Sequence, residues 1–291
     1  TSNGFETFVI ELSNLKEQSK KGIELLTALL KSPNYTQDTL NKLKTMQTGS
    51  LKRKENDFDY VANNQLKSVL FKGTTLENSA AGTIESISKI ELKDIENFIS
   101  QTVCLENLII VAGGDFELKE FEKLVKPLLE TLNVGKKAQL EEVNFISKKE
   151  EKVLIKDTQQ AYIYFGSSFN INSKDEENYK AKVASFILGG SGFGSRLMEE
   201  IRVKRGLAYS AYGSISINKS HSYFNGYLQT KNETADEAKK LVGEIIEDFV
   251  KNGVTNDELS AAKNFLTGSE PLRSETLSQR LNRAYTLDYR G

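Results

Sequence analysis

Residues 188–210 read LGGSGFGSRLMEEIRVKRGLAYS, and the rest of the chain is interpreted outward from this stretch. Glycine adopts positive φ at little cost and lets a second backbone approach closely. From Ser195 onward, apolar and charged residues follow at helical spacing, with a serine in the N-cap position and basic residues near the end. Gly206 ends this predicted helix, and residues 207–212 predict a strand. The glycines of the preceding loop are Gly189, Gly190, Gly192 and Gly194.

A glycine-rich loop of this kind could be a phosphate cradle or simply a flexible loop. A phosphate loop follows a strand, and a Lys-Ser/Thr pair or a ribose-binding acid follows it at fixed spacing. Here residues 176–188 predict a helix before the loop, and no Gly-Lys-Ser/Thr comes after it. Nucleotide binding is therefore disfavoured.

The composition excludes several classes of protein. The chain has 291 residues with 39 basic and 40 acidic side chains, so net charge gives no attraction to nucleic acid or to a membrane surface. The longest apolar run, residues 108–112, is far too short to span a bilayer. A single cysteine, Cys104, excludes an internal disulfide. We therefore expect a soluble protein, while cytoplasm, periplasm and organelle matrix all remain open.

Periodicity predicts a chain of mixed α+β class. Apolar residues at helical spacing predict helices, and alternating or continuous apolar runs of strand length predict strands. The predicted helices cover residues 16–31, 37–58, 60–71, 91–102, 117–132, 176–188, 234–251 and 255–285. The predicted strands cover residues 5–12, 108–112, 152–156, 160–167, 209–216 and 223–229, the last two forming an antiparallel pair.

An internal repeat organises these elements. Seven of sixteen positions are identical when YTQDTLNKLKTMQTGS, residues 35–50, is laid on VTNDELSAAKNFLTGS, residues 254–269, at an offset of 219. The predicted elements around both segments agree at the same offset. The sequence therefore predicts two related α+β units, each a mixed or antiparallel sheet packed with helices.

The repeat also sets the expected domain boundaries. The first unit would cover residues 1–132 and the second residues 152–291, joined by a charged, aperiodic linker at residues 133–151. At the offset of 219, the counterpart of residues 153–221 would lie before residue 1, and the second unit would continue beyond residue 291. Both units are therefore expected to be incomplete, and the chain to be a fragment.

The stretch GGSGFGSRLMEEIRVKRGLAYSAYGS, residues 189–214, resembles the second-half signature of pitrilysin-type (inverzincin) zinc peptidases. This family includes insulin-degrading enzyme and the mitochondrial processing peptidase. In it, a glycine-rich loop followed by RLxxEIRxxRGLAY precedes a strand beside the active chamber. The resemblance implies a duplicated pitrilysin-like fold, in which Arg202 and Tyr209 line the chamber opposite a zinc ion and hold the substrate near the scissile bond.

The chemistry of this pair suits that role. A fixed guanidinium and a phenol can donate hydrogen bonds to a peptide carbonyl, which anchors a substrate or stabilises oxyanion charge. Without the resemblance, Arg202 and Tyr209 are more simply a surface arginine and a strand tyrosine. Arg205 is a weaker candidate for the same surface. The strand at residues 207–216 also offers an edge to which an extended peptide could add.

The sequence does not predict a metal site. The family's HxxEH signature needs two imidazoles one helical turn apart, and this chain has one histidine, His221, in a predicted solvent-exposed turn. The resemblance aligns Ser50 with the family's third, glutamate ligand and Gly49 with the acid before it, while Glu55 falls on another helix face. We therefore expect no cofactor on this chain and zinc on a partner subunit.

Three interpretations follow. The preferred one is a non-catalytic subunit of a two-subunit zinc metalloendopeptidase, which supplies Arg202 and Tyr209 to a zinc-bearing, pitrilysin-like partner that cleaves a peptide substrate. The first alternative is a complete peptidase whose HxxEH part has been removed. The second is a structural or assembly core subunit without activity, against which the intact Arg202–Tyr209 pair argues. The sequence alone leaves open whether the protein is an enzyme.

Overall fold

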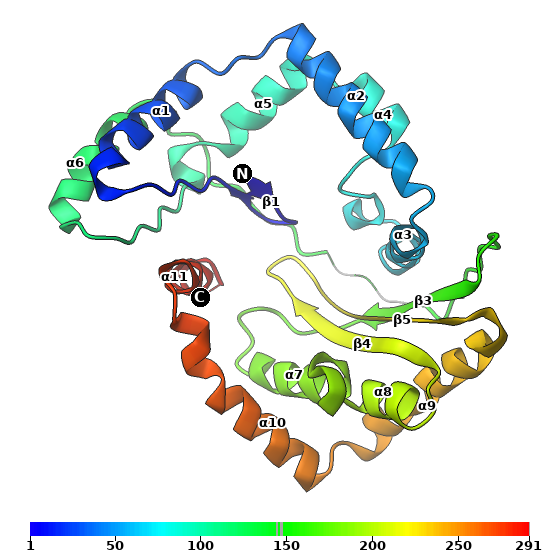
Figure 1. Ribbon diagram of the computed structural model, residues 1–291. Coiled ribbons are helices and arrows are strands. Elements are labelled where there is room, and N and C mark those ends of the chain that lie inside the picture. Colours follow the sequence, from blue (N-terminus) through cyan, green and yellow to red (C-terminus); the bar gives the residue numbers. More distant parts are fainter. Residues whose placement is uncertain (144, 146–147, 291) are drawn as a thin grey trace. The chain divides into compact units, whose positions relative to one another are not determined.

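The computed structural model describes residues 1–143, 145 and 148–290. The chain forms two compact units, each assembled from separate stretches of sequence (Figure 1). Residues 144, 146 and 147 of the predicted linker lie outside the described residues, and the division of the sequence at that linker stays a prediction. Unit 1 contains Thr1–Lys52, Ala80–Leu140 and Arg273–Tyr289, and unit 2 is formed mainly by Arg53–Ser79 and Glu141–Leu272.

Unit 2 is built on a three-stranded antiparallel sheet. Its strands are β3 (Gln160–Ser168), β4 (Ala208–Ile217) and β5 (Ser222–Lys231), in the order β3-β5-β4. The predicted antiparallel pair at residues 209–216 and 223–229 is confirmed, as is the strand at residues 160–167. The register of β4 against β5 shifts between Ala208 and Ala211, where Tyr209 lies.

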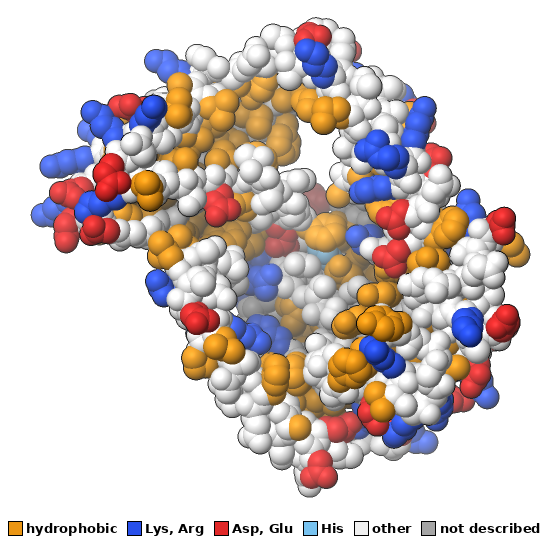
Figure 2. Space-filling view, viewed as in Figure 1, with side chains coloured by type: hydrophobic (Ala, Val, Ile, Leu, Met, Phe, Trp, Pro, Cys, Tyr) orange, Lys and Arg blue, Asp and Glu red, His pale blue; other side chains and the backbone are white. Residues whose placement is uncertain are grey.

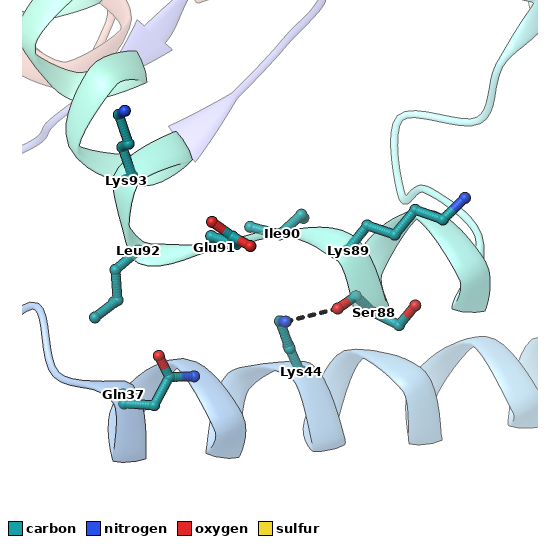
Figure 3. Close-up of a pocket in the computed structure, with 8 residues that line it drawn as sticks. All are labelled: Gln37, Lys44, Ser88, Lys89, Ile90, Glu91, Leu92 and Lys93. Atoms are coloured by element: carbon teal, nitrogen blue, oxygen red, sulfur yellow. Dashed lines mark hydrogen bonds between the residues drawn. The ribbon is translucent and has the colours of Figure 1, made fainter.

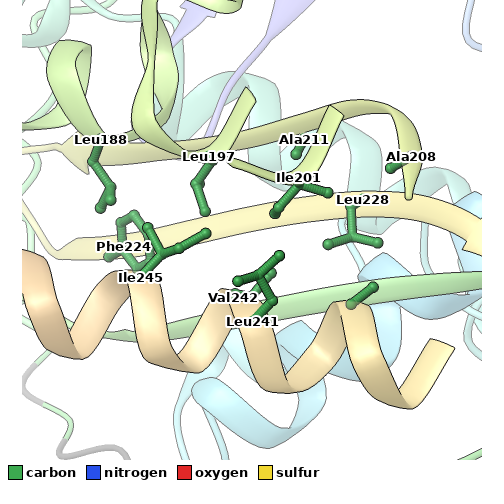
Figure 4. Close-up of a cluster of buried hydrophobic side chains, with 11 residues drawn as sticks. Leu188, Leu197, Ile201, Ala208, Ala211, Phe224, Leu228, Leu241, Val242 and Ile245 are labelled. Atoms are coloured by element: carbon green, nitrogen blue, oxygen red, sulfur yellow. The ribbon is translucent and has the colours of Figure 1, made fainter. Parts of the chain in front are cut away.

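One face of this sheet carries the hydrophobic core. Helix α8 (Arg196–Met198), the π-helical turn Glu199–Val203 that continues it, and helix α9 (Ala235–Asn252) pack on this face. Figure 4 shows Leu197 and Ile201 directed toward side chains of α9. Full burial of a leucine or isoleucine stabilises a fold by about 1.5–3 kcal/mol relative to exposure. This core therefore fixes the turn that contains Arg202 against the sheet.

The other face of the sheet carries a row of tyrosines. Tyr164, Tyr227 and Tyr212 are register partners across the three strands, and their rings stack with centroids 5.4 and 5.5 Å apart. Helix α3 (Phe58–Leu70) covers this face at β3, where burial and then a hydrogen bond to Asp59 raise the pKa of Tyr164. At β4 the row ends in Tyr212, which is 39% exposed. The sheet face is therefore open on the β4 side.

Unit 1 consists mainly of helices. Lys44 of α2 donates a hydrogen bond of 2.8 Å from Nζ to the carbonyl of Ser88, which joins α2 to the α4–α5 connection beside a cavity of about 480 Å³ (Figure 3). A Cβ added to Gly113 would lie 2.8 Å from Leu277, so α11 packs closely on this backbone. The helices are α1 (Ser19–Lys31), α2 (Gln37–Lys54), α4 (Ile84–Lys89), α5 (Leu92–Thr102), α6 (Leu118–Leu129) and α11 (Leu277–Arg290).

The described part of unit 1 has a single short strand pair, β1 (Ser2–Asn3) with β2 (Phe8–Val9). Its amphipathic helices therefore lack a sheet to cover. Apolar side chains remain at the surface in Figure 2, and those of unit 1 include Leu25, Leu29, Met46, Phe98 and Leu118. The strand predicted at residues 5–12 is reduced to β2, and residues 108–112 form no strand, because strands need partners to pair with.

Two other expectations are corrected. Residues 152–156 have no regular secondary structure, so the strand predicted there is absent. The single helix predicted at residues 255–285 is two helices, α10 (Asn256–Gly268) and α11, separated by a 3₁₀ turn at Glu270–Ser274. Pro271 lies in that turn; it has no N–H to donate and its ring clashes with the preceding turn of a continuous helix.

The element boundaries agree with the predicted duplication. Helix α2 begins at Gln37 and α10 at Asn256, 219 residues later, and α3 and α11 begin at Phe58 and Leu277, also 219 residues apart. The third helix of each repeat belongs to the compact unit of the other, since α3 lies in unit 2 and α11 in unit 1. The fold is α+β, as the sequence predicts.

Candidate functional site

The glycine-rich loop leads into α8 through a serine cap. Ser195 is fully buried; its Oγ accepts a hydrogen bond from the Met198 amide at 3.4 Å and donates one of 2.7 Å to the carbonyl of Gly192. The predicted cap is therefore confirmed. The helix itself differs from the prediction, because after Met198 it widens into the π-helical turn Glu199–Val203.

The π-helical turn sets the position of Arg202. The Lys204 amide donates to the carbonyl of Glu199 at 2.9 Å, which is the five-residue spacing of a π-turn, and the Leu207 amide donates to the carbonyl of Ile201. Such turns are rare and are frequently found at functional sites. Gly206, with φ of 63°, then reverses the chain into β4. Tyr209 follows at once, so Arg202 and Tyr209 face each other across this reversal.

The guanidinium of Arg202 contacts two aromatic rings. Its Cζ lies 4.3 Å from the ring centroid of Tyr209 and 4.6 Å from that of Phe193. Both distances are within the range of cation–π attraction. The two rings are exposed, by 81% and 63% respectively. The structure thus brings together the two residues singled out from the sequence and adds Phe193 as a third.

Phe193 was missed in the sequence analysis because it lies inside the loop and not in the helix or strand. Its position between Gly192 and Gly194 was the available signal, since a large apolar residue in a glycine-rich loop has no core to enter. Gly192 has φ of 65°, a value that glycine adopts without strain. We name the three residues Phe193, Arg202 and Tyr209 the arginine stack.

The other cations of the motif are engaged elsewhere. Glu200 accepts hydrogen bonds from Lys204 Nζ at 2.6 Å and from Arg205 Nη1 at 2.7 Å. The pKa of Glu200 is lowered, first by Lys204 and then by Arg205. Arg205 Nη1 also donates to the Glu200 carbonyl at 2.9 Å. Arg205, the weaker candidate from the sequence, therefore stabilises the π-helical turn through its hydrogen bonds to Glu200.

Arg196 has a different set of partners. Its Nε and Nη2 donate to the two carboxylate oxygens of Glu258 at 2.5 and 2.8 Å, and Nη2 also donates to the carbonyl of Gly253 at 2.7 Å. Nη1 reaches Asp248 at 3.2 Å, and Cζ lies 5.0 Å from the ring centroid of Phe249. The hydrogen bonds from Arg196 are the main cause that lowers the pKa of Glu258 to about 2. Arg196 thus ties α8 to α9 and to the start of α10.

A cavity of about 660 Å³ lies beside these elements. Its lining residues include Arg196, Asp248 and Glu258, and also Phe193. Phe193 is thus shared between this cavity and the stack with Arg202, and Arg202 itself does not line the cavity.

The glycines serve packing and turning. A Cβ on Gly189 would lie 2.2 Å from the backbone nitrogen of Gly213, so the π-helical turn Phe186–Gly190 rests directly on β4. Gly190 and Gly194 are less crowded. A Cβ added to Gly190 would lie 3.2 Å from the carbonyl oxygen of Ser185, and one added to Gly194 would lie 3.5 Å from Ser191 Oγ. The loop accordingly positions Phe193 and has the character of a packing element, not of a phosphate cradle.

The edge of β4 is partly closed. The Ile215 amide donates to Ser185 Oγ at 3.0 Å, and Ser185 belongs to helix α7 (Asn178–Ser185). The close approach of Gly189 to Gly213 covers the same stretch. The expectation that a peptide could add as a strand along residues 207–216 is therefore wrong for this part of β4, because α7 and the turn after it occupy that edge.

His221 is not the solvent-exposed turn histidine that the sequence suggested. It is 5% exposed and packs against the rings of Phe71 and Tyr223 at 5.6 and 5.7 Å. Its ring nitrogens lie 2.8 Å from Ser220 Oγ and 3.3 Å from Asn218 Nδ2. His221 is buried among aromatic rings and not exposed to solvent, because α3 ends over the β4–β5 hairpin and places Phe71 against it.

Among the described residues, the side chains present do not fit a zinc ion. In the described part of the chain, no group of three or more His, Cys, Asp or Glu side chains is placed to hold a metal. Ser50, which the resemblance aligns with the family's glutamate ligand, lies in α2 with Gly49 beside it.

Comparison with known proteins identifies the family. Residues 89–266 match the model described as "Peptidase M16 inactive domain". The chain belongs to the M16 peptidase family. The matched segment contains the glycine-rich loop and the whole arginine stack, so the resemblance predicted from residues 189–214 is confirmed. Pitrilysin-type peptidases and M16 peptidases are two names for this family.

Individual relatives agree. The chain is 46% identical to the "Non-peptidase homolog YmxG" of Helicobacter pylori, over 98% of this chain and 66% of that protein. It is 22% identical to the "Uncharacterized zinc protease YmxG" of Bacillus subtilis, over 92% of this chain and 65% of that protein. The chain therefore spans about two thirds of the length of these relatives.

Solved structures share the fold. The peptidase M16 inactive domain from Pseudomonas fluorescens superposes with a TM-score of 0.82 at 25% identity, over 87% of this chain and 61% of that one. A structure described as a protease from Helicobacter pylori has a TM-score of 0.79 at 19% identity, over 91% and 66% of the two chains. Within the described residues, no helix is both long and apolar enough to cross a membrane.

Proposed function

We propose that this chain is the non-catalytic partner of a zinc-bearing M16 endopeptidase and that the arginine stack holds the peptide substrate for that partner. The observation that carries the proposal is the state of Arg202. Its guanidinium is half-buried and fixed by two aromatic rings, yet among the described residues no carboxylate, carbonyl or hydroxyl accepts a hydrogen bond from it.

Such a group is ready to bind a ligand. Fixing a long side chain costs up to about 2 kcal/mol of rotamer entropy, and here the rings have already fixed it. The neighbouring cations Arg196, Lys204 and Arg205 all have acidic partners. The unpartnered donors of Arg202 therefore distinguish this position from the rest of the motif.

The surface around Tyr209 suits an extended peptide. Tyr212 and Ser214 follow it along β4 and are exposed, on the side of the sheet that α3 leaves open. Phenol and hydroxyl groups can donate to and accept from a peptide backbone without demanding a particular sequence. An extended segment lying across this strand would bring its carbonyls to Arg202 and Tyr209.

The family match supports the non-catalytic part of the proposal. The matched domain is described as inactive, and the relative from Helicobacter pylori is named a non-peptidase homolog. The zinc ion and the residues that activate water would come from the partner. A structural or assembly subunit without activity is the competing possibility, and it requires no peptide binding at Arg202.

The test is activity in trans. We expect the purified protein alone to cleave no quenched fluorescent peptide and the mixture with a zinc-bearing M16 protein of the same organism to cleave it. Arg202→Ala is expected to lower kcat/KM of the mixture by about a hundredfold, as loss of one positioned donor does elsewhere. Tyr209→Phe removes only the hydroxyl and should act in the same direction more weakly.

The matched control is Lys182→Ala, which removes one exposed cation from α7, away from the arginine stack. Size-exclusion chromatography of each mixture shows whether assembly is intact. If an assembled complex with Arg202→Ala and Tyr209→Phe cleaves peptide at the wild-type rate, the substrate-holding role is wrong and the structural role replaces it.

A further inference from the structure

The geometry of the arginine stack restricts what Arg202 can bind. A guanidinium is planar and has five N–H donors, all directed outward in its plane. The rings of Phe193 and Tyr209 lie within 4.6 Å of its Cζ and make no ring contact with each other in the described part of the chain. They therefore cover different sides of the group, and a ligand meets Arg202 at the edge where the donors are.

An edge of paired donors matches a carboxylate better than a single carbonyl. Two parallel N–H groups can bind both oxygens of a carboxylate, and each of these charge-assisted hydrogen bonds is about twice as strong as a neutral one. A peptide carbonyl uses one donor and leaves the others to water. The rings also exclude water from the sides of the guanidinium, which strengthens an ionic contact at its edge.

The local charge favours a monoanion. Lys204 and Arg205 are both bound to Glu200, so neither is available to share a ligand with Arg202. A phosphate carries close to two negative charges near neutral pH and is usually bound by several cations or amides. One free guanidinium between two exposed apolar rings suits a single carboxylate that has apolar groups on either side.

We infer that the arginine stack binds a peptide carboxylate: an aspartate or glutamate side chain flanked by apolar residues, or a peptide C-terminus. This inference rests on the proposed function, in which the same surface holds a peptide, and it adds the chemical class of that peptide. Phe193 is then a specificity-determining residue, because its ring both fixes the guanidinium and contacts the apolar neighbours of the acid.

The experiment measures peptide binding by fluorescence anisotropy on the purified protein, without any zinc-bearing partner. The probe is a short labelled peptide with a central Leu-Glu-Leu in a neutral Ser/Ala sequence and an amidated C-terminus. Two companions carry Gln in place of Glu, one amidated and one with a free C-terminus. We expect the Glu peptide to bind about tenfold more tightly than the amidated Gln peptide, which equals about 1.4 kcal/mol.

The variants test each part of the stack. Arg202→Gln should abolish the preference for Glu over Gln, and Phe193→Leu, which keeps apolar bulk but removes the ring, should reduce it severalfold. Lys182→Gln makes the same charge change on α7 and should keep the preference. Raising the salt from low to about 1 M should also weaken the preference, because the Debye length falls to about 3 Å.

The outcomes are distinct. Equal binding of the Glu and Gln peptides, with Arg202→Gln weakening both alike, would overturn the carboxylate inference and leave the peptide-holding role in place. Binding that Arg202→Gln does not change, or no binding of any probe, would overturn both. Tighter binding of the free C-terminus than of the internal Glu supports the inference and assigns the carboxylate to a chain end.

Discussion

Replacement of Arg196 by glutamine provides a quantitative test of how α8 is anchored. Arg196 binds both oxygens of Glu258, the carbonyl of Gly253 and the carboxylate of Asp248, and it contacts the ring of Phe249. Glutamine is shorter and uncharged, so all of these contacts are lost together. Glu258 keeps its bonds to Thr255 at the start of α10 but loses its counter-charge.

The magnitude follows from the exposure of the pair. An exposed ion pair is worth about 0–1 kcal/mol, and breaking a buried one costs about 3–5 kcal/mol. The side chains of Arg196 and Glu258 are 15% and 25% exposed, so their contact lies between these limits. The bond to Gly253 adds about 1 kcal/mol, and the contact with Phe249 about 0.5–1 kcal/mol. We expect Arg196→Gln to lower the free energy of unfolding by about 2–4 kcal/mol.

The loss of stability in Arg196→Gln should depend on pH, and the direction of that dependence follows from the pKa of Glu258. The pKa of Glu258 is lowered from its ordinary 4.5 to about 2, chiefly by Arg196. A carboxyl with a lowered folded-state pKa stabilises the fold above its unfolded-state pKa, and this stabilisation is lost as the pH falls through the folded value. In Arg196→Gln the pKa of Glu258 should return toward 4.5. The difference in the free energy of unfolding between wild type and Arg196→Gln should therefore be largest at neutral pH and should decrease as the pH falls from 4.5 to about 2.

The assay is urea unfolding followed by far-ultraviolet circular dichroism at neutral pH and at several lower values, with the slope m checked for constancy. Arg196→Lys keeps the charge but not the bidentate geometry and should lose about half as much as Arg196→Gln. Lys204→Gln, which breaks a more exposed pair with Glu200, is the matched control and should cost about 0–1 kcal/mol. If Arg196→Gln lies within about 0.5 kcal/mol of wild type at neutral pH, the anchoring role is refuted.

Two further predictions concern packing and metal. Gly189→Ala should destabilise the protein by about 3 kcal/mol or more, because its Cβ would lie 2.2 Å from the backbone nitrogen of Gly213, which cannot move aside. Gly243→Ala in α9 is the control; its Cβ would have nothing within 4 Å, so it should stabilise the protein by about 0.5–1 kcal/mol. Comparable unfolding midpoints for the two variants would contradict this prediction. After dialysis against a mild chelator, elemental analysis should find far less than one equivalent of zinc per chain. The reason is that His221 is buried and that, in the described residues, no group of three or more His, Cys, Asp or Glu side chains could hold a metal ion. Stoichiometric zinc would contradict the proposal that the partner carries the zinc.

Much of the site could be predicted from local sequence because its parts are close along the chain. Arg202 and Tyr209 are seven residues apart, and the helix end, Gly206 and the strand start between them were all visible in the pattern. Phe193 could not be placed, because a residue in a glycine-rich loop has no periodicity. The π-helical turn was also invisible, since it lies at the end of the helix, where few apolar positions follow to reveal the shift in helical phase.

Expectations that depended on tertiary partners were less successful. His221 was interpreted as exposed because it lies in a turn between two strands, but Phe71 at the end of α3, 150 residues earlier in the chain, packs against it and helps to bury it. The strands expected at residues 108–112 and 152–156 have suitable composition and no neighbouring strand. Pro271 was a local signal that the sequence analysis overlooked, and it separates α10 from α11.

The contrast between Arg196 and Arg202 gives the clearest argument that this surface binds something. The two residues lie six positions apart in one short motif, and both have acidic residues within reach along the chain. The fold gives Arg196 four hydrogen bonds to carboxylates and a carbonyl and places it near 15% exposure. It gives Arg202 two aromatic rings and no acceptor among the described residues.

Stability alone does not explain the second arrangement. Cation–π contacts at an exposed site contribute about 0.5–1 kcal/mol each, and the two rings that supply them remain largely in water, which costs part of that gain. A glutamate at the position of Tyr209 or Phe193 would neutralise Arg202 and remove an exposed aromatic ring. The chain instead keeps a fixed cation with its donors unused, and an external carboxylate is the group that would complete it.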